Sequence, residues 1–144
     1  MIVFLMALAL SLIELVMMMH TYNVLADSAK EGLRYAIVHG TGNSQPTGPT
    51  CPANCADITG PAAPPGTVPG YRSGYGVVKT YAQYSLHDIS NLTVTVSYPD
   101  TANPPANQAP NRVQVQVSYP YGAFFGLGWP TITVNANAEG RIAN

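Results

Sequence analysis

The sequence predicts an α+β protein in which a long hydrophobic N-terminal helix carries a small head with a short helix and a three-stranded antiparallel sheet. Three observations support this fold class. The first nineteen residues are almost entirely apolar, and helical spacing of apolar residues continues to Val38. A segment rich in proline and glycine follows. Three later segments alternate apolar and polar residues, as strands do. We divide the chain into a helix (1–39), a loop (40–73) and a β-rich head (74–144).

The front of the chain, MIVFLMALALSLIELVMMM, has only two polar residues, Ser11 and Glu14. Most of the other side chains are large, and burying each one stabilises by about 1.5–3 kcal/mol. Such a surface cannot stay in water, so we expect it to lie in a bilayer or among neighbouring subunits. Glu14 alone would cost about 2.5–3.5 kcal/mol at a bilayer centre, which is too little to prevent insertion.

From His20 to Val38 the helix is expected to be apolar on one face only. The apolar positions at helical spacing are Tyr22, Leu25, Ala26, Ala29, Leu33, Ala36 and Ile37. The charged residues lie off this face as two pairs of opposite sign, Asp27 with Lys30 and Glu31 with Arg34. His39 and Gly40 form a stop signal. The helix would be about 58 Å long at 1.5 Å per residue, a stalk that carries a head.

The segment 40–73 has no periodicity and is expected to be a solvent-facing loop. It holds the only two cysteines of the chain, Cys51 and Cys55. A bridge between them would stabilise by about 2 kcal/mol on chain-entropy grounds. Two free thiols or half of a metal site are the alternatives, but no second cysteine or histidine pair completes a zinc site. A disulfide is favoured, and it implies an oxidising location outside the cytoplasm.

A short helix is predicted from Gly74 to about Asp88, with one face made by Val77, Val78, Tyr81, Tyr84 and Ser85. The period then changes to two, which predicts strands over 91–98, 112–119 and 131–138. Their apolar face carries Leu92, Val94, Val96, Val113, Val115, Val117, Ile132, Val134 and Ala136. Strands joined in sequence form an antiparallel meander, and we expect its apolar face to pack on the one-sided half of the long helix.

Residues 22–40, Y-N-V-L-A-D-S-A-K-E-G-L-R-Y-A-I-V-H-G, directly follow the apolar run that contains I-E-L. This stretch resembles the TadE-like pilin and pseudopilin family of tight-adherence pilus systems. The matching positions are Tyr22, Asn23, Leu25, Ala29, Glu31, Gly32, Arg34, Tyr35 and Ala36. The later strands and the terminal A-E-G-R are similar to the family too. The resemblance implies a small membrane-inserted subunit or assembly factor of a secreted filament.

The start of the chain departs from the pattern of that family. Met1 leads directly into apolar residues with no basic leader before them, and we expect this end to persist in the final protein. Cleavage after Ala9 would make Glu14 the fifth residue, as in type IV pilins. We reject this register because MIVFLMALA is apolar where such leaders are basic. Only Leu15 to Met19 would then follow Glu14 as apolar anchor.

Composition argues against several classes of function. Charged residues make up 9% of the chain, against roughly 25% in ordinary soluble domains, and the formal net charge is −1. The chain therefore lacks the basic surface that nucleic-acid binding requires. No serine lies in a nucleophile motif, and His20, His39 and His87 share no ligand spacing. We expect no enzyme activity, no cofactor and no metal.

The expected function is structural. The chain would be a subunit of an extracellular pilus-like filament, polymerised with identical copies through its N-terminal helix. Before assembly that helix would lie in the inner membrane, and a pilus assembly machinery would export the subunit. The interface residues we expect are Glu14, Tyr22, Lys30, Glu31 and Arg34. Glu14 would set the register of a helical bundle or, alternatively, be an acid tolerated near the membrane interface.

Two other functions stay open at this point. One is a minor pseudopilin, an assembly factor of a Tad-type secretion system that is retained in the inner membrane. The other is a surface adhesin module, which would bind a ligand through the loop 40–73.

Overall fold

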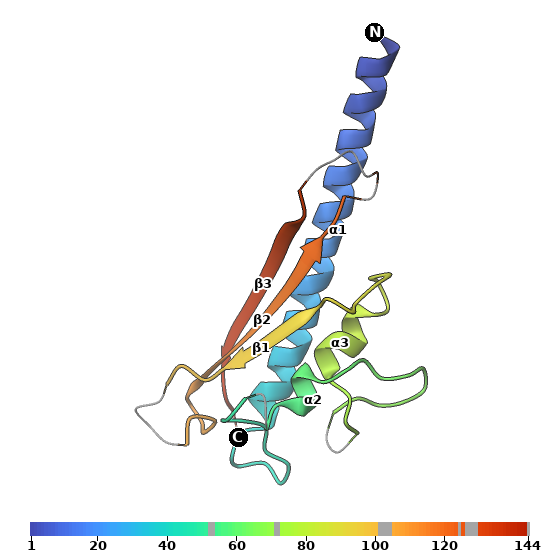
Figure 1. Ribbon diagram of the computed structural model, residues 1–144. Helices are drawn as coiled ribbons and strands as arrows, with labels where there is room; N and C mark the ends of the chain where they lie inside the picture. Colours follow the sequence, from blue (N-terminus) through green and yellow to red (C-terminus); the bar gives the residue numbers. More distant parts are fainter. Residues whose placement is uncertain (52–53, 71–72, 101–104, 124, 126–129, 144) are drawn as a thin grey trace.

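The computed structural model describes the whole chain except residues 52–53, 71–72, 101–104, 124, 126–129 and 144. Its elements are α1 (Ile2–Val38), α2 (Ala56–Thr59), α3 (Val77–Ala82), β1 (Thr93–Ser97), β2 (Arg112–Tyr121) and β3 (Ile132–Arg141). Figure 1 shows α1 as the axis of the molecule, with the sheet along its back half and α2 and α3 beside its C-terminal end. The front half of α1 projects alone. The predicted α+β fold class is confirmed.

The end of α1 lies where the stop signal predicts it. The helix ends at Val38, and the backbone N–H of His39 donates to the carbonyl of Tyr35 at 3.2 Å. The imidazole of His39 also stacks on the ring of Tyr35, with 3.9 Å between ring centroids. The C-terminus of the chain returns to this point, because the backbone N–H of Ala143 donates to the carbonyl of Ile37 at 3.0 Å.

The buried face of the back half of α1 is rotated slightly from the predicted stripe. Its buried residues are Thr21, Val24, Leu25, Ser28, Ala29, Gly32 and Ala36. The prediction is wrong at Tyr22, whose residue is 50% exposed. Small side chains line this face because α1 packs closely against both the sheet and α3. A large ring at the contact would hold these elements apart.

Gly32 sets the distance of closest approach between α1 and the head. A Cβ atom placed on Gly32 would collide with Cγ2 of Val78 in α3 and lie 3.2 Å from Cγ2 of Ile58 in α2. The absence of a side chain therefore lets three helices meet at one point of the core. Leu25, Ile58 and Val78 are fully buried around it.

The sheet is an antiparallel meander of order β1–β2–β3, as predicted. Val117 pairs with Val94 on one side and with Ala136 on the other. Three valines of β2 face α1 and are fully buried: Val113, Val115 and Val117. Ile132, also predicted to face the core, is 45% exposed. It pairs with Tyr121 at the end of the sheet that points toward the front half of α1.

The segment 40–73 is less solvent-facing than expected. It contains α2, and its buried residues include Thr47, Cys55, Ile58 and Ala63. The predicted helix over 74–88 is also shorter, since α3 has six residues. Its buried residues are Val78, Thr80 and Ala82, whereas Tyr81 and, beyond its end, Tyr84 are exposed. Aliphatic side chains fill the narrow space beside Gly32, so the tyrosines turn outward.

Candidate assembly surface

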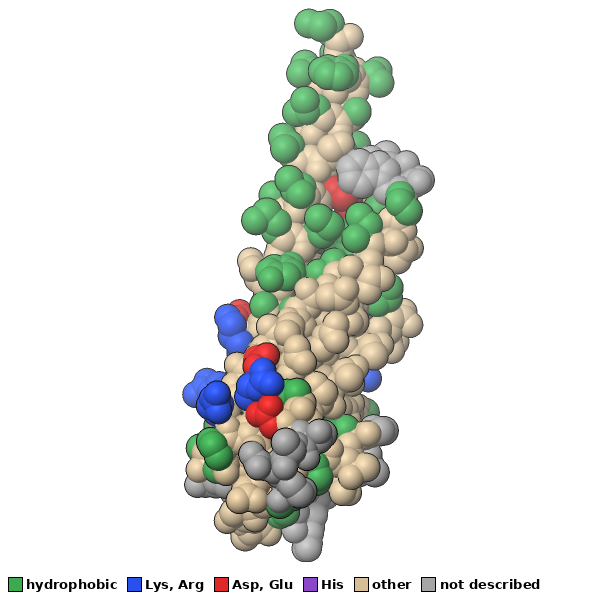
Figure 2. All heavy atoms as spheres, turned by 90° about the vertical axis from the view of Figure 1, so that its left-hand side faces the viewer, with side chains coloured by type: hydrophobic (Ala, Val, Ile, Leu, Met, Phe, Trp, Pro, Cys, Tyr) green, Lys and Arg blue, Asp and Glu red, His purple; other side chains and the backbone are tan. Residues whose placement is uncertain are grey.

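The front half of α1 is a surface that the head leaves uncovered. Among its exposed large apolar side chains are Met1, Ile2, Val3, Phe4, Leu5, Met6, Leu8, Leu12, Ile13, Leu15, Val16, Met17 and Met19. Figure 2 shows these side chains projecting on the part of the molecule that stands clear of the head. In its most apolar 18-residue window, only 6% of residues are buried. A core helix would be mostly buried, so this surface needs another environment.

The helix has the length and composition of a membrane span. Among the described residues it is the one helix that is long and apolar enough to cross a bilayer. A span needs about 20 apolar residues, which the front of α1 supplies with Glu14 as its one charged side chain. This is consistent with a single-pass membrane anchor.

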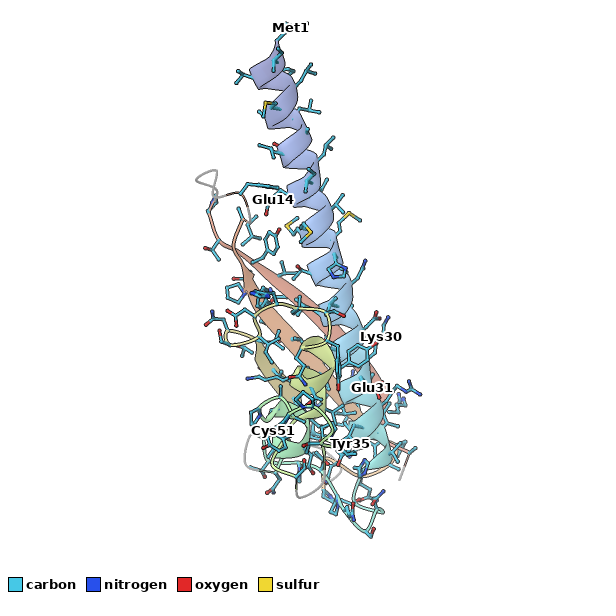
Figure 3. The ribbon with its side chains drawn as sticks, turned by 90° about the vertical axis from the view of Figure 1, so that its right-hand side faces the viewer. Met1, Glu14, Lys30, Glu31, Tyr35 and Cys51 are labelled. Carbon is cyan, nitrogen blue, oxygen red and sulfur yellow. A yellow bond between two sulfur atoms is a disulfide. The ribbon has the colours of Figure 1, made fainter. Side chains whose placement is uncertain are left out.

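Glu14 marks the point where the head begins to cover the helix. Its side chain is buried, with 3% of the residue exposed, although eight of the ten residues before it are exposed. The phenolic O–H of Tyr121 donates to Oε1 of Glu14 at 2.6 Å. Figure 3 shows Glu14 pointing from α1 toward the end of the sheet.

Sequence reasoning did not identify Tyr121 as the partner of Glu14. It considered a partner in another subunit or a position at a membrane interface. The alternation of strand 112–119 ends two residues before Tyr121, so the pattern placed this tyrosine in a connection. β2 instead extends to Tyr121, which carries the hydroxyl group to the level of Glu14.

An apolar groove lies beside this hydrogen bond, between α1 and the end of the sheet. Its volume is about 320 Å³, and it is lined by Leu8, Ser11, Leu12, Glu14, Leu15, Met18, Tyr121, Ala123, Pro130 and Ile132. A second hollow, of about 300 Å³, continues toward the exposed Tyr22 and is lined in part by Met18, Met19 and Ile132. The apolar surface of the front half therefore continues onto the sheet end.

The charged residues in the back half of α1 lie on its solvent-facing side. Nζ of Lys30 lies 3.2 Å from Oδ1 of Asp27, and Nη1 of Arg34 lies 3.5 Å from Oε2 of Glu31. Both pairs join residues of the same helix, as predicted from their spacing. Figure 3 shows Lys30 and Glu31 on α1, well away from Glu14. The structure thus brings Glu31 and Arg34 together, but not with Glu14.

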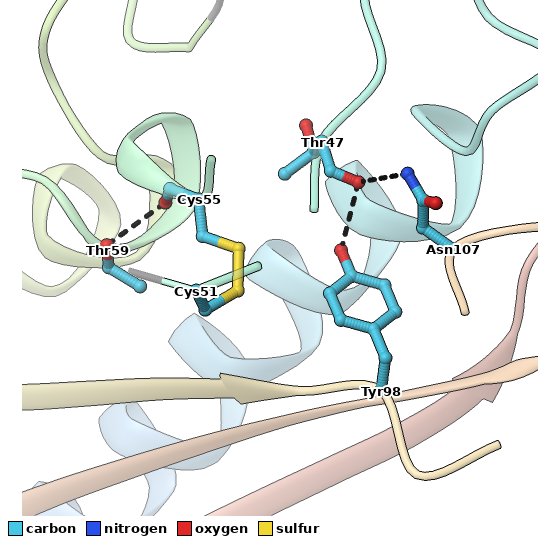
Figure 4. The surroundings of a disulfide bond; sticks show 6 residues. All are labelled: Thr47, Cys51, Cys55, Thr59, Tyr98 and Asn107. Atoms are coloured by element: carbon cyan, nitrogen blue, oxygen red, sulfur yellow. Dashed lines mark hydrogen bonds between the residues drawn. A yellow bond between two sulfur atoms is a disulfide. The ribbon is translucent and has the colours of Figure 1, made fainter. Parts of the chain in front are cut away.

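The predicted disulfide between Cys51 and Cys55 is confirmed, with 5.2 Å between the two Cα atoms. It lies at the end of the head that is remote from Met1 (Figure 3). Beside it, the carbonyl of Thr47 accepts hydrogen bonds from Tyr98 at 3.2 Å and from Asn107 at 3.0 Å (Figure 4). These buried contacts join the loop 40–73 to the sheet, and the sequence pattern gave no sign of them.

Metal chemistry finds no support in the residues that the structure describes, since no three His, Cys, Asp or Glu side chains there are grouped to hold an ion. Comparison of the chain with protein-family models, with curated proteins and with solved structures gave no match. Inference about function therefore depends on the surface of α1 and the head that it carries.

Proposed function

We propose that this chain is a structural subunit of an extracellular, pilus-like filament, and that its copies assemble through the front half of α1. One observation supports the proposal above the others: a folded head leaves about half of a 37-residue helix uncovered, and that half is apolar on every side. Surface of this kind requires either lipid or other copies of the same helix.

The proposed subunit exists in two states. In the first, α1 spans the inner membrane and the head lies outside the cytoplasm, where the disulfide between Cys51 and Cys55 is stable. In the second, the front halves of many copies pack together along the axis of a filament. Lipid tails and leucine side chains are about equally apolar, so the exchange has little net hydrophobic cost and is driven by close packing. The chain shows no nucleotide-binding motif, and other proteins would supply the energy for export.

In the filament, the heads would form the outer coat. The ion pairs of the back half, Asp27–Lys30 and Glu31–Arg34, are exposed and would be available for lateral contacts between neighbouring subunits. Tyr22, which is exposed at the junction between the two halves, would add an apolar lateral contact. Glu14 would define how far one helix slides along the next, because its burial beside Tyr121 fixes the level at which the head begins.

A membrane-retained assembly factor is the second candidate. The observation that favours it is the match between the apolar length of α1 and the thickness of a bilayer. In that function the helix would stay in the membrane, and few copies would be needed for each filament.

Shear fractionation distinguishes the two candidates. The full chain is expressed in cells that carry a pilus assembly system, the surface filaments are sheared off, and the chain is quantified in the sheared and membrane fractions. A filament subunit is expected to be the main protein of the sheared fraction. Retention in the membrane fraction alone would contradict the first candidate and support the second.

Two variants locate the surface that filament assembly requires. Leu5→Asp places a charge in the front half of α1 and is expected to abolish recovery in the sheared fraction. Val68→Asp places the same charge at an exposed position of the head and is the matched control, because Val68 is 82% exposed. Equal loss for both variants would show that recovery does not depend on the helix surface.

A further inference from the structure

We infer that the end of the sheet formed by Tyr121, Ala123, Pro130 and Ile132 enters the lipid leaflet beside α1, so that the membrane-bound subunit is held at two places. The inference depends on the membrane state of the proposed function. It concerns a surface of the head, however, and not the helix itself.

The length of the apolar run sets the depth at which this end of the sheet lies. From Met1 to Met19, α1 covers about 27 Å at about 1.5 Å per residue, which is close to the thickness of about 30 Å of a hydrocarbon core. Glu14 lies five residues before Met19, and therefore about 8 Å inside the boundary of that core. Tyr121 touches Glu14 through a 2.6 Å hydrogen bond, so the end of β2 lies at the same depth.

The chemistry of the sheet changes along its length in agreement with this depth. No charged residue occurs between Arg112 and Glu139, a stretch that includes the whole connection between β2 and β3. The charged groups lie at the opposite end of the sheet, where Arg112 pairs with Asp100 at 2.9 Å and with Glu139 at 3.3 Å. The end near Glu14 instead exposes Ile132 and Pro130 beside Leu8 and Leu12.

A neighbouring hollow marks the level at which polar groups begin. It has a volume of about 290 Å³ and lies on the other side of Tyr121, where Tyr121 and Gly122 face a polar lining of His20, Ser85, His87 and Asp88. His20 is the first residue after the apolar run of α1. Imidazole, hydroxyl and carboxylate groups at this level suit the headgroup layer of a membrane. The groove nearer the N-terminus of α1, in contrast, is almost entirely apolar.

The hydrogen bond from Tyr121 explains how a carboxyl group is tolerated at this depth. A polar group taken out of water is costly unless it has a hydrogen-bond partner. Tyr121 supplies such a partner from within the same subunit, and the phenol ring adds apolar surface around it. The head would thus carry the partner of Glu14 into the leaflet with it.

Lipid fits this surface better than a second copy in the membrane state. A partner helix would cover one stripe of α1 and leave polar residues on the rest of its circumference. Every residue from Met1 to Ala9 is exposed, and all of them are apolar. The surface therefore suits a surrounding that is the same in every direction, and the apolar groove beside Ile132 continues it onto the end of the sheet.

Fluorescence quenching in bilayers tests the inference. Single cysteine variants of the full chain at Ile132, Leu5 and Val68 are labelled with a polarity-sensitive fluorophore, while Cys51 and Cys55 remain in their disulfide. The labelled proteins are reconstituted into phosphatidylcholine vesicles that contain lipids with a nitroxide high or low on the acyl chain. We expect the labels at Ile132 and at Leu5 both to be quenched most by the shallow nitroxide, because each lies less than about 10 Å inside one boundary of the hydrocarbon core. The label at Val68 should keep its emission.

The three labels separate the possible failures. Loss of emission at Leu5 without loss at Ile132 would overturn the inference and leave the membrane anchor intact. No loss at Leu5 would contradict the anchor itself. A third outcome is a blue shift of the label at Ile132 that occurs only at high protein-to-lipid ratios, with no quenching by the nitroxide lipids. This outcome would show that a second copy of the chain, and not lipid, covers the groove. If Ile132→Cys does not fold, Phe125→Cys reports on the same connection, since Phe125 is 36% exposed.

Discussion

Tyr121 and Glu14 are separated by 107 positions in the sequence, yet the hydroxyl of one lies 2.6 Å from the carboxyl of the other. This contact joins the far end of β2 to the middle of the apolar run of α1. Among the described residues, it is the side-chain hydrogen bond between the head and α1 that lies closest to the N-terminus of the helix. Everything in α1 before Glu14 projects beyond it, which defines the surface available to lipid or to other subunits.

Removal of the hydroxyl group from Tyr121 should loosen this junction. We expect Tyr121→Phe to lower the free energy of unfolding by about 1–3 kcal/mol, because a buried acceptor loses its donor. Urea unfolding in a mild detergent measures the change. Tyr84→Phe is the matched control, since Tyr84 is 76% exposed and should give no measurable change. Equal stability of the two variants would show that the contact with Glu14 does not hold the head to the helix.

Alkaline pH should weaken the contact between the sheet and the loop 40–73. Burial raises the pKa of Tyr98 to about 12, above its ordinary value of 10.0. Ionisation is therefore easier in the unfolded chain, so the contribution of Tyr98 is complete below pH 10 and is lost as the pH rises toward 12. We expect a loss of about 1–2 kcal/mol over this range, less than full burial would give.

Tyr98→Phe isolates this effect, because phenylalanine keeps the buried ring and has no hydroxyl group to ionise. Stability measured by chemical unfolding at a series of alkaline pH values should fall less steeply in the variant than in the parent chain. Parallel pH profiles would contradict the assignment of the effect to Tyr98.

A methyl group at Gly32 should destabilise the core even though alanine favours helices by about 1 kcal/mol over glycine. The added Cβ atom would collide with Cγ2 of Val78, and overpacking of this kind costs about 1–3 kcal/mol. Val78→Ala should restore the space that the added methyl group needs. The free energy of unfolding of the double variant Gly32→Ala/Val78→Ala should therefore fall by less than the sum of the losses in the two single variants. Thermal unfolding of the four proteins in a double-mutant cycle measures this coupling. Additive effects would show that the two positions do not compete for one space.

Charge reversal on the solvent-facing side of α1 should affect assembly and not folding. Exposed ion pairs contribute little to stability, so Arg34→Glu is expected to leave the melting temperature nearly unchanged. The yield of sheared filaments should fall several-fold if this surface makes lateral contacts. Lys79→Glu makes the same charge change in α3, outside the ion pairs of α1. A similar loss of filaments in both variants would argue for a general effect of charge.

Local patterns were sufficient to predict α1 and the three strands, but not α2. The apolar run and the spacing up to Val38 predicted α1, and period-two alternation predicted each strand, because these signals reflect single faces of single elements. The polarity of the 40–73 segment was misleading. Its residue Ile58 is fully buried, and one apolar side chain among prolines and glycines leaves no periodic signal.

The contacts at the junction could not be predicted for a different reason. Whether Tyr22 or Thr21 faces the sheet depends on the rotation of α1, which the close approach at Gly32 determines. The partner of Glu14 depends on how far β2 extends beyond its alternating part. Both are consequences of tertiary packing, so no local window of sequence contains them.

A three-dimensional reconstruction of the sheared filaments by electron cryomicroscopy would test directly whether the front half of α1 is an assembly surface. We expect density for residues 2–19 at the filament axis, where each copy packs against the same residues of its neighbours, with the heads outside. Filaments that exclude this chain, or a purified chain that is a dissolved monomer without its apolar front, would contradict the proposal.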